Sequence, residues 1–459
     1  MYFEPLTPED VADIIRVEQP VGVVVAFGGQ TAIRLTKWLS DNYIPILGTP
    51  ADSIDMAEDR GRFEALLRKL HIEQPAGTTV HTRAEALVAA NTLGYPVLLR
   101  PSYVLGGQNM IIAFSDEDVN EYMEIILSNM EGNAVLIDKY MMGTELEVDA
   151  ICDGENVLIP GIMQHIDRAG IHSGDSIAVY PAWALTKEQT EQIVDYSEKL
   201  AISLKTKGLI NIQYVISQNQ IYVIEVNPRS SRTVPYLSKV TGIPMIDIAT
   251  EVMLGKKLTD FPYGTGLYPS APYTAVKVPV FSFEKLSGLD TMLGPEMKST
   301  GEVLGIAPTM TEALYKGLLG AGYCFTNEGG VLLTVRDTDK KEIIEIAREY
   351  KKLGFHLYAT EGTTAALREA GLPVTLVHKI HESEQNTLSL LESGKINYII
   401  STSAKGRSPL RGSVKVRRKS VELGIPCLTS LDAAKALAQT LAYGWNVKEA
   451  SLVDICKLQ

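Results

Sequence analysis

The side chains best suited to chemistry lie in one stretch, residues 208–232, which reads GLINIQYVISQNQIYVIEVNPRSSR. Polar and apolar side chains alternate with period two, which predicts two β-strands joined by a tight turn, with one apolar face and one polar face. The polar face and the residues after it carry Asn211, Gln213, Glu225, Asn227, Arg229 and Arg232. Amide and carboxylate oxygens beside arginines suit a magnesium ion that holds phosphate. A polar outer face exposed to water is the alternative explanation of the same pattern.

The length of the turn decides which of these side chains meet. A three-residue turn over residues 218–220 would set Gln213 opposite Glu225, whereas a two-residue turn would set Ile212 against Glu225. We therefore predict the three-residue turn. The other predicted pairs are Asn211 with Asn227, Ile212 with Val226, Tyr214 with Ile224, and Ile216 with Tyr222.

The composition is that of a globular protein with several domains. The chain has 459 residues, of which 45% are hydrophobic and 21% charged, and its formal charge is -12. This length predicts about two to four domains. A general nucleic-acid binder is not expected, because such proteins neutralise phosphates with a basic surface.

Cysteine spacing and apolar runs predict a cytoplasmic protein. The four cysteines are far apart, which argues against disulfides and zinc; they are Cys152, Cys324, Cys427 and Cys456. No apolar run approaches the roughly 20 residues of a membrane helix, and the N-terminus MYFEPLTPED lacks a signal pattern. We therefore expect neither a membrane association nor export.

Residues 1–52 have the pattern of a partial α/β unit. A helix is predicted to start at Thr7, a buried strand to span Val21 to Phe27, and a second strand to span Ile44 to Leu47. A double glycine at 28–29 follows the first strand, where α/β sheets place ligands. The unit is short for a complete nucleotide-binding domain, so we expect the chain to begin partway into a larger unit.

Three polar segments follow within residues 53–258. Arg100 ends a predicted strand just before Gly106-Gly107, which is either a plain turn or a flap over phosphate. Residues 143–149 alternate acidic with apolar side chains, and we expect an ordinary exposed strand there. The loop at 166–176 crowds charged side chains around two glycines, which is too much chemistry for a simple connection.

The last part of the chain, residues 326–459, alternates strands and helices of lengths that predict a small doubly wound parallel sheet. Threonines at a helix start and a basic loop at 401–413 suit phosphate. A capped helix and a solvated basic loop are the alternative. Residues 259–325, rich in Pro, Gly and Tyr in their first part, are predicted to form a connecting segment.

Taken in their order along the chain, these residues resemble the ATP-grasp enzymes, and more closely the carboxyl-terminal half of the large subunit of carbamoyl-phosphate synthetase. The resemblance covers nearly the whole chain. It is carried by RPSYVLGG (100–107), EVDAICDGE (147–155), AGIHSGDS (169–176), IEVNPRSSRTVP (224–235) and LGPEMKSTGEV (293–303). It implies a multidomain α/β and α+β fold: a partial pre-ATP-grasp domain over 1–52, an ATP-grasp domain over 53–258, a connecting segment over 259–325, and a methylglyoxal-synthase-like allosteric domain over 326–459.

The resemblance implies a site for ATP and for Mg²⁺ or Mn²⁺. Its ATP-binding residues would be Arg100, Gly106, Gly107, Lys139, Met141, Glu145 (at the ribose), Gly170, Ile171, His172, Ser173, Gln213 and Glu225. The metal would be held by Gln213, Glu225 and Asn227, matching the polar face above. Arg229 and Arg232 would hold the acceptor anion and Arg100 the transferring phosphate. Family members in this half transfer the γ-phosphoryl group of ATP to carbamate, giving carbamoyl phosphate for pyrimidine and arginine biosynthesis.

The resemblance also implies an effector site in the last domain. The positions that bind UMP or IMP in the family, with neighbours in the same loop, are Lys340, Thr360, Thr363, Lys379, Ser401 (where an asparagine is usual), Ser403 and Ser413. Ornithine-responsive members have a glutamate just after the lysine that matches Lys277, and Val278 stands there in this chain. Although Asp167 and Asp175 are kept, we expect weak or absent ornithine activation. Methylglyoxal synthase activity is not expected, because the loop 401–413 has no acidic residue.

Two parts of the family's enzyme lie outside this sequence: the first ATP-grasp half with the start of the second, and the glutaminase small subunit. We therefore expect that this chain does not perform the full synthesis alone, whether it is an excised piece or one piece of a split enzyme. Another ATP-grasp ligase, such as a biotin-dependent carboxylase subunit, and a non-catalytic nucleotide-binding fragment are the alternatives. The unit over 326–459 counts against the carboxylase.

Overall fold

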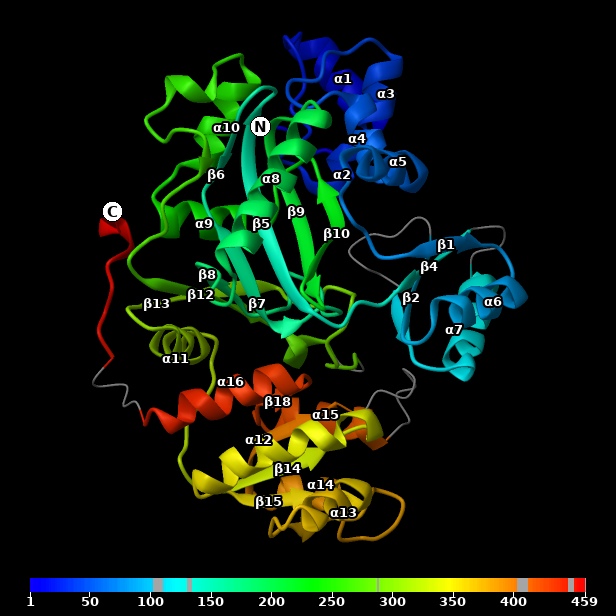
Figure 1. Ribbon diagram of the computed structural model, residues 1–459, viewed down its shortest axis with the longest axis vertical. Coiled ribbons are helices and arrows are strands. Elements are labelled where there is room, and N and C mark those ends of the chain that lie inside the picture. The colour runs from blue at the N-terminus through cyan, green and yellow to red at the C-terminus, as the bar shows by residue number, and fades with distance from the viewer. Residues whose placement is uncertain (102–109, 130–133, 287–288, 403–411, 445–449, 459) are drawn as a thin grey trace.

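Three β-sheets organise the computed structural model of the chain (Figure 1). The structure describes residues 1–101, 110–129, 134–286, 289–402, 412–444 and 450–458. In Figure 1 the N-terminal helices lie at the top right, the largest sheet fills the centre with a small lobe to its right, and the domain built from the last part of the chain lies below. Within those described ranges, no helix is both long enough and apolar enough to cross a bilayer.

The N-terminal residues form short helices around one pair of extended segments. The helices are α1 (Pro8–Glu18), α2 (Gly29–Ile33), α3 (Thr36–Asp41), α4 (Ala51–Glu58) and α5 (Arg60–Leu70). The first helix begins as predicted, since the Thr7 hydroxyl accepts from the N–H of Asp10. The two predicted strands are reduced to one parallel bridge between Val23 and Ile46. The prediction of a buried strand over Val21 to Phe27 is wrong, because Val21 is 83% exposed and periodicity alone does not reveal burial.

A small lobe consists of an antiparallel sheet with strand order β1-β4-β2-β3 and two helices. Its elements are β1 (Gly77–Val80), α6 (Arg83–Leu93), β2 (Val97–Pro101), β3 (Ile111–Ala113), α7 (Asp116–Asn129) and β4 (Val135–Lys139). Thr82 and Glu85 form a capping box that starts α6 at the predicted residue. Apolar side chains of α6 and α7 pack on one face of the sheet and form the lobe's core.

The central sheet follows the order β10-β9-β5-β7-β8-β12-β13. Off this path, β6 pairs with β5, and β11 pairs with β6. Its strands are β5 (Thr144–Asp153), β6 (Val157–Ile159), β7 (Ile162–Arg168), β8 (Ala178–Tyr180), β9 (Lys207–Ser217), β10 (Gln220–Asn227), β11 (Gly266–Leu267), β12 (Thr274–Val280) and β13 (Gly301–Ala307). Strands β11, β12 and β13 lie within the predicted connecting segment, so these residues continue the sheet.

Helices cover both faces of this sheet unequally. They are α8 (Lys187–Ser203), α9 (Val234–Thr241), α10 (Met245–Met253) and α11 (Met310–Gly320), with short 3₁₀ turns at Leu258–Asp260 and Phe283–Lys285. The face that carries Ile212 and Tyr214 packs against α8 and α5. On the opposite face, α9 and α10 cover only the end that carries Ile151 and Leu209. The rest of that face is polar and is described below.

The last domain has a five-stranded parallel sheet with order β16-β15-β14-β17-β18, which confirms the predicted doubly wound sheet. Its strands are β14 (Gly330–Thr334), β15 (His356–Ala359), β16 (Thr375–Leu376), β17 (Ile396–Ser401) and β18 (Cys427–Leu428). Its helices are α12 (Lys340–Lys352), α13 (Glu361–Glu369), α14 (Thr387–Glu392), α15 (Gly412–Glu422) and α16 (Leu431–Ala442), with 3₁₀ turns at Asp337–Asp339 and Ile455–Lys457.

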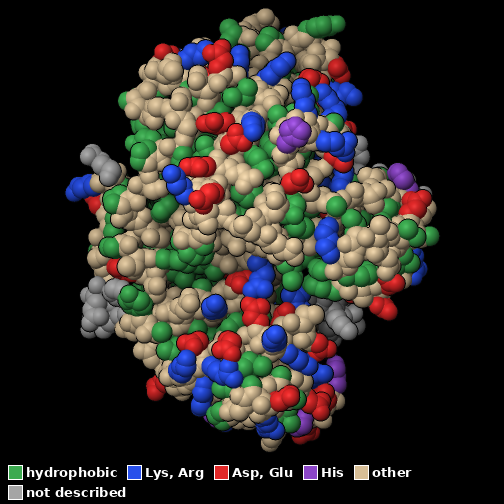
Figure 2. Space-filling model, viewed as in Figure 1, with side chains coloured by type: hydrophobic (Ala, Val, Ile, Leu, Met, Phe, Trp, Pro, Cys, Tyr) green, Lys and Arg blue, Asp and Glu red, His purple; other side chains and the backbone are tan. Residues whose placement is uncertain are grey.

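Apolar packing and ion pairs both join this domain to the central sheet. One core cluster includes side chains of β12, α11, α12 and α16. At the end of β7, the Arg168 guanidinium makes two bonds of 2.7 and 2.8 Å to Asp432 and two of 2.6 and 3.2 Å to Glu342. Arg417 makes two bonds of 2.7 Å to Asp290. Figure 2 shows acidic and basic side chains gathered where the lower domain meets the body of the molecule.

We predict that Arg168→Met lowers the free energy of unfolding by about 1–2 kcal/mol, because a bidentate pair inside a charge network contributes more than an isolated surface pair. Urea unfolding measures the loss. The matched control is Arg68→Met, whose partner Glu64 is on the same exposed helix face; it should lose less than about 0.5 kcal/mol. Equal losses in the two variants would contradict the role of the junction.

Candidate active site

The hairpin of β9 and β10 sets Gln213 opposite Glu225 and Asn211 opposite Asn227, as predicted. The predicted turn is nevertheless wrong. The turn has two central residues, Gln218 and Asn219, which both adopt positive φ, of 51° and 65°. This is the left-handed conformation that favours a two-residue hairpin turn.

A β-bulge reconciles the short turn with the predicted site pairs. The register shifts between Val223 and Glu225, so Ile224 has no partner on β9 and is 37% exposed. The predicted pairs of Tyr214 with Ile224 and of Ile216 with Tyr222 are therefore wrong: Tyr214 faces Val223 and Ile216 faces Ile221. The extra residue restores the alternation beyond it, which returns Glu225 to the polar face.

Strand β5 extends this polar face into the sheet, with Glu147 opposite Gln213 and Asp149 opposite Asn211. The prediction that residues 143–149 form an exposed strand is wrong, because Glu145, Glu147 and Asp149 are 4%, 2% and 1% exposed. Side chains from distant parts of the chain cover this face, His165 on β7 and Thr233 before α9, a tertiary effect that an alternating pattern does not report.

A buried histidine, His165 on β7, compensates these carboxylates. Its Nδ1 lies 3.6 Å from Glu145 and its Nε2 lies 3.4 Å from Glu147. Burial alone lowers the pKa of His165, but the two carboxylates outweigh burial and raise it. Burial alone would raise the pKa of Glu147, but the hydrogen bond and charge of His165, together with other donors, bring this pKa below its usual range. The two shifts favour the charged forms of this pair, an imidazolium and a carboxylate.

The two flanking acids behave differently. Burial raises the pKa of Glu145 to about 7, with His165 opposing the shift. Burial, then the charge of Glu147, raises the pKa of Asp149 to about 7. The cluster therefore holds fewer negative charges near neutral pH than its three carboxyl groups would suggest.

The predicted metal ligands lie at the solvent side of this cluster. The Gln213 side-chain amide donates to Ser173 Oγ at 3.2 Å, which leaves its carbonyl oxygen available. Asn227 Oδ1 accepts from Arg229 Nη2 at 3.0 Å, and Glu225 is exposed. Among the residues that the structure describes, no three His, Cys, Asp or Glu side chains are grouped as metal ligands. The donor set that fits a hard cation is therefore two amide oxygens and the Glu225 carboxylate.

The two arginines after β10 point to the same region from a segment without regular structure. Arg229 is largely buried, which lowers its pKa, and it bonds to Asn227 and to the Ser230 carbonyl. Arg232 is exposed and its Nη1 lies 3.3 Å from Ser299 Oγ. Arg229 thus lies beside the predicted metal ligand Asn227, while Arg232 lies against Met297 and Ser299.

The predicted nucleotide loop, residues 169–176, contacts both the hinge and the hairpin. Gly170 has a φ of 112°, and a Cβ there would meet the Tyr140 hydroxyl. Ile171 is the next residue of this loop and is partly buried. The His172 N–H donates to the Gly294 carbonyl at 2.8 Å. Ser173 meets Gln213, as given above, so the loop joins two predicted parts of one pocket.

Lys277, on β12, holds this loop in place through hydrogen bonds to its backbone. It is 1% exposed, and its Nζ donates to the carbonyls of Ser173 and Gly174 at 2.9 and 3.4 Å. Burial lowers its pKa, with Glu147 opposing the shift. Three residues of the site were not predicted from the sequence in these roles: Lys277, His165 and Thr233. A lysine or histidine inside an apolar strand is the signal that could have marked Lys277 and His165.

On the small lobe, Arg100 and Lys139 are engaged with the protein. Arg100 Nε lies 3.3 Å from Asp138, whose other oxygen is 2.5 Å from Arg60. Lys139 Nζ donates to the carbonyls of Gly94 and Tyr95 at 2.7 and 3.2 Å. The Lys139 side chain is thus committed to the hinge of the lobe. Met141 is partly buried at this hinge, and Gly106 and Gly107 lie outside the described residues.

The predicted effector residues are only partly brought together. Lys340 starts α12, bonds to Asp337 at 2.7 Å, and lies so close to Gly362 that a Cβ there would meet its Nζ. Thr360 and Thr363, at the start of α13, are 8% and 1% exposed. The remaining residues are placed as follows: Lys379 is exposed, Ser401 is fully buried with its Oγ bonded to Arg417, Ser413 is in the first turn of α15, and Ser403 lies outside the described residues.

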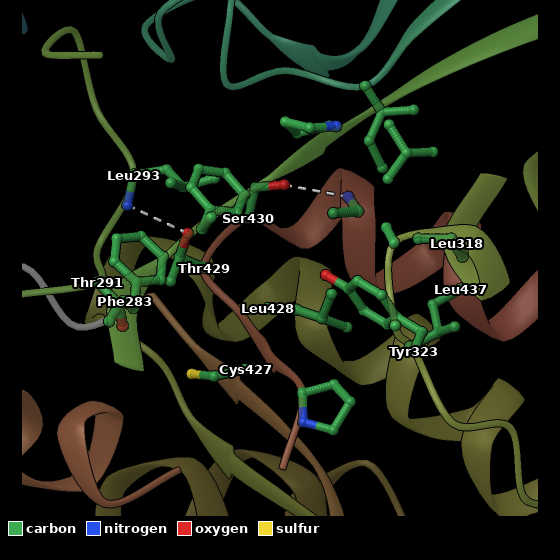
Figure 3. A pocket seen from close by; sticks show the side chains of 18 of the residues that line it. Phe283, Thr291, Leu293, Leu318, Tyr323, Cys427, Leu428, Thr429, Ser430 and Leu437 are labelled. Atoms are coloured by element: carbon green, nitrogen blue, oxygen red, sulfur yellow. Dashed lines mark hydrogen bonds between the residues drawn. The ribbon is translucent and has the colours of Figure 1, made fainter. Parts of the chain in front are cut away.

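A cavity of about 300 Å³ lies where the central sheet meets the last domain (Figure 3). Asp167, Asp175 and Val278 all line it, so the three positions linked above to ornithine meet in one place. Figure 3 shows Leu293 bonded to Thr429 on one side, with Tyr323, Leu318 and Leu437 opposite. Val278 contributes a methyl surface where a carboxylate would bind an ammonium group.

Three family models match successive parts of the chain. Residues 1–56 match the carbamoyl phosphate synthase preATP-grasp domain, residues 59–261 the ATP binding domain of the carbamoyl-phosphate synthase L chain, and residues 342–429 the MGS-like domain. The carbamoyl phosphate synthase large chain of Lachnoclostridium phytofermentans is 55% identical over the whole of this chain. The chain spans 43% of the length of that relative.

Solved structures support the fold at lower identity. The biotin carboxylase domain of Hydrogenobacter thermophilus 2-oxoglutarate carboxylase is similar over 62% of this chain and 65% of its own, with 18% identity and a TM-score of 0.52. Rhizobium etli pyruvate carboxylase is similar over 60% of this chain and 25% of its own, with 20% identity and a TM-score of 0.51. With 55% identity to a carbamoyl phosphate synthase large chain over the whole of this chain, and with two models of that enzyme's domains matched in succession, the chain belongs to the carbamoyl phosphate synthase large chain family.

Proposed function

We propose that this chain transfers the γ-phosphoryl group of ATP to carbamate, giving carbamoyl phosphate and ADP, as the carboxyl-terminal half of the synthase. One observation carries the proposal: Gln213 and Glu225 face each other on one sheet, with Asn227, Arg229 and Arg232 directly beyond them. This is an arrangement for anions and a hard cation on a wall of buried charge.

The acceptor requires little covalent help, because a carbamate oxygen is already anionic. Phosphoryl transfer then depends on alignment and on neutralising the negative charge that spreads over the equatorial oxygens. Arg229 and Arg232 would bind the acceptor and draw off this charge. Arg229 is held by Asn227, and Arg232 is near Ser299, so both guanidinium groups are oriented before the substrate arrives.

Gln213, Glu225 and Asn227 would hold Mg²⁺ or Mn²⁺ through their oxygens, and this metal supplies charge neutralisation to the phosphates when bound. The nucleotide would lie between the hinge at Met141 and the loop 170–173. Arg100 would approach the phosphates from the small lobe, after release from Asp138 or together with it. Water exclusion matters because carbamate and its phosphate decompose in water.

We include regulation and partners in the proposal. UMP or IMP would bind the last domain near Lys340, Thr360 and Thr363, where a lysine lies over a helix start. Carbamate would come from the amino-terminal half of the enzyme, supplied with ammonia by the glutaminase small subunit, in the cytoplasm. Identity of 55% to a large chain supports this assignment over another ATP-grasp ligase.

We predict that Glu225→Gln and Asn227→Ala each slow ATP formation from Mg-ADP and carbamoyl phosphate by about 100-fold or more, because the first removes the negative charge of a proposed metal ligand and the second removes a proposed metal oxygen. The coupled ATP assay measures this rate. Glu191→Gln is the matched control, since this acid is exposed on α8 and pairs with Lys187 of the same helix; it should retain the rate. A near wild-type rate in either site variant would refute the metal assignment. No ATP from the folded wild-type chain would favour the non-catalytic alternative.

We predict that calorimetry detects binding of UMP and no tight binding of ornithine, each at its own site. UMP should bind and change the rate of ATP formation, and Lys340→Met should lose both effects, because it removes the cation beside α13. Lys352→Met, at the other end of α12, should keep them.

Ornithine should not bind tightly, because Val278 offers no carboxylate in the cavity. Tight ornithine binding, or unchanged UMP binding in Lys340→Met, would contradict these assignments.

A further inference from the structure

The segment that carries Arg229 and Arg232 has no regular structure of its own. It spans residues 228–233, between the end of β10 and the first residue of α9. Such a segment positions two guanidinium groups only if its backbone is fixed by contacts from outside. Its middle is fixed by Ser230, whose N–H and hydroxyl both donate to the Ala26 carbonyl, at 3.0 and 3.1 Å.

The far end of the segment is fixed by Thr233 in an unusual way. Thr233 is the N-cap residue of α9, where a threonine normally accepts a hydrogen bond from an N–H of the first helical turn. Thr233 makes no such bond. Its hydroxyl instead lies 2.5 Å from Asp149 Oδ2 and 3.2 Å from Glu147 Oε1, on the wall of buried carboxyl groups.

These contacts are buried and mutually dependent. Thr233, Asp149, Glu147 and Asn211 are 3%, 1%, 2% and 2% exposed. The Asn211 amide donates to Glu147 at 2.8 Å and to Asp149 at 3.0 Å. The second oxygen of Asp149 accepts from the Thr233 hydroxyl, and the Ser231 hydroxyl, 2.8 Å from that of Thr233, is a further donor to this carboxyl group. Without the Thr233 hydroxyl, the buried carboxyl group loses its shortest donor contact and Ser231 loses its partner, which is costly enough to displace the backbone around them.

We propose that Thr233, anchored on Asp149, is a positioning residue for the phosphoryl acceptor, because it fixes the segment that presents Arg229 and Arg232. The inference rests on the proposed function, in which these arginines hold the acceptor. In the proposed function the nucleotide lies between the hinge and the loop 170–173, and the side-chain hydrogen bonds of Thr233 within the described residues reach Ser231, Glu147 and Asp149, not the hinge or that loop. Thr233 should therefore affect binding of the acceptor and leave binding of the nucleotide unchanged.

The test is a KM comparison in ATP formation from carbamoyl phosphate and Mg-ADP with the full chain. Thr233→Val, which keeps the shape and removes the hydroxyl, should raise the KM for carbamoyl phosphate by about tenfold and the KM for ADP by less than about twofold. Thr233→Ser, which keeps the hydroxyl, should restore values near wild type. Asp149→Asn should reproduce the effect of Thr233→Val, because Asn211 and Thr233 donate to different oxygens of Asp149 and an amide offers only one acceptor oxygen in place of the two.

The matched control is Thr241→Val in the same helix, whose hydroxyl bonds to the Leu237 carbonyl within α9; both KM values should stay unchanged. An unchanged KM for carbamoyl phosphate in Thr233→Val and Asp149→Asn would overturn the proposal. So would an equal rise in both KM values, or failure of Thr233→Ser to restore the wild-type values.

Backbone hydrogen exchange without substrates separates this inference from the proposed function. The amides of residues 229–233 should exchange about tenfold faster in Thr233→Val than in wild type or Thr241→Val. If wild type forms no ATP, the proposed function fails, and this exchange result still decides the anchor. Equal exchange in all three proteins would overturn the anchor whether or not wild type is active.

Discussion

The register of one hairpin is the constraint on which the site depends. A two-residue turn with positive φ at Gln218 and Asn219 would, by alternation alone, bring Ile212 opposite Glu225. The bulge at Ile224 inserts one residue and returns Glu225 and Asn227 to the face of Gln213 and Asn211. The Val223 N–H donates to the Glu73 carbonyl at 2.9 Å, so a neighbouring segment holds the strand on the turn side of the bulge. Turn and bulge therefore act together to set the metal face.

The second requirement is that this face tolerates buried charge. Glu145, Glu147 and Asp149 would repel one another, and they would repel phosphates, if all were ionised inside the sheet. His165 between two of them, Lys277 nearby, and raised pKa values for Glu145 and Asp149 reduce the net negative charge. This buried face can then support the arginine segment and the loop 170–173 through hydrogen bonds, without repelling anionic substrates.

Local signals in the sequence predicted the elements well. The first helix starts at Thr7 with its capping bond, as predicted, and the alternating elements after residue 326 form the predicted parallel sheet. The site pairs of Gln213 and Asn211 were predicted because polar residues converge only in one register. What the sequence could not reveal was tertiary. The burial of Glu147 and Asp149 depends on strands from elsewhere, and the bulge at Ile224 mimics a longer turn, so two compensating errors gave the right pairing near Glu225.

The central claim is that Gln213, Glu225 and Asn227 converge on one cation beside the arginine segment. A crystal structure of the chain grown with Mn²⁺ and ADP tests it most directly, because the anomalous signal of the metal locates it independently of the protein. The account predicts a peak with side-chain oxygens of Glu225 and at least one of the two amides at about 2.0–2.3 Å. A metal held by phosphate oxygens away from Glu225, or a hairpin in which Glu225 does not face Gln213, would contradict it.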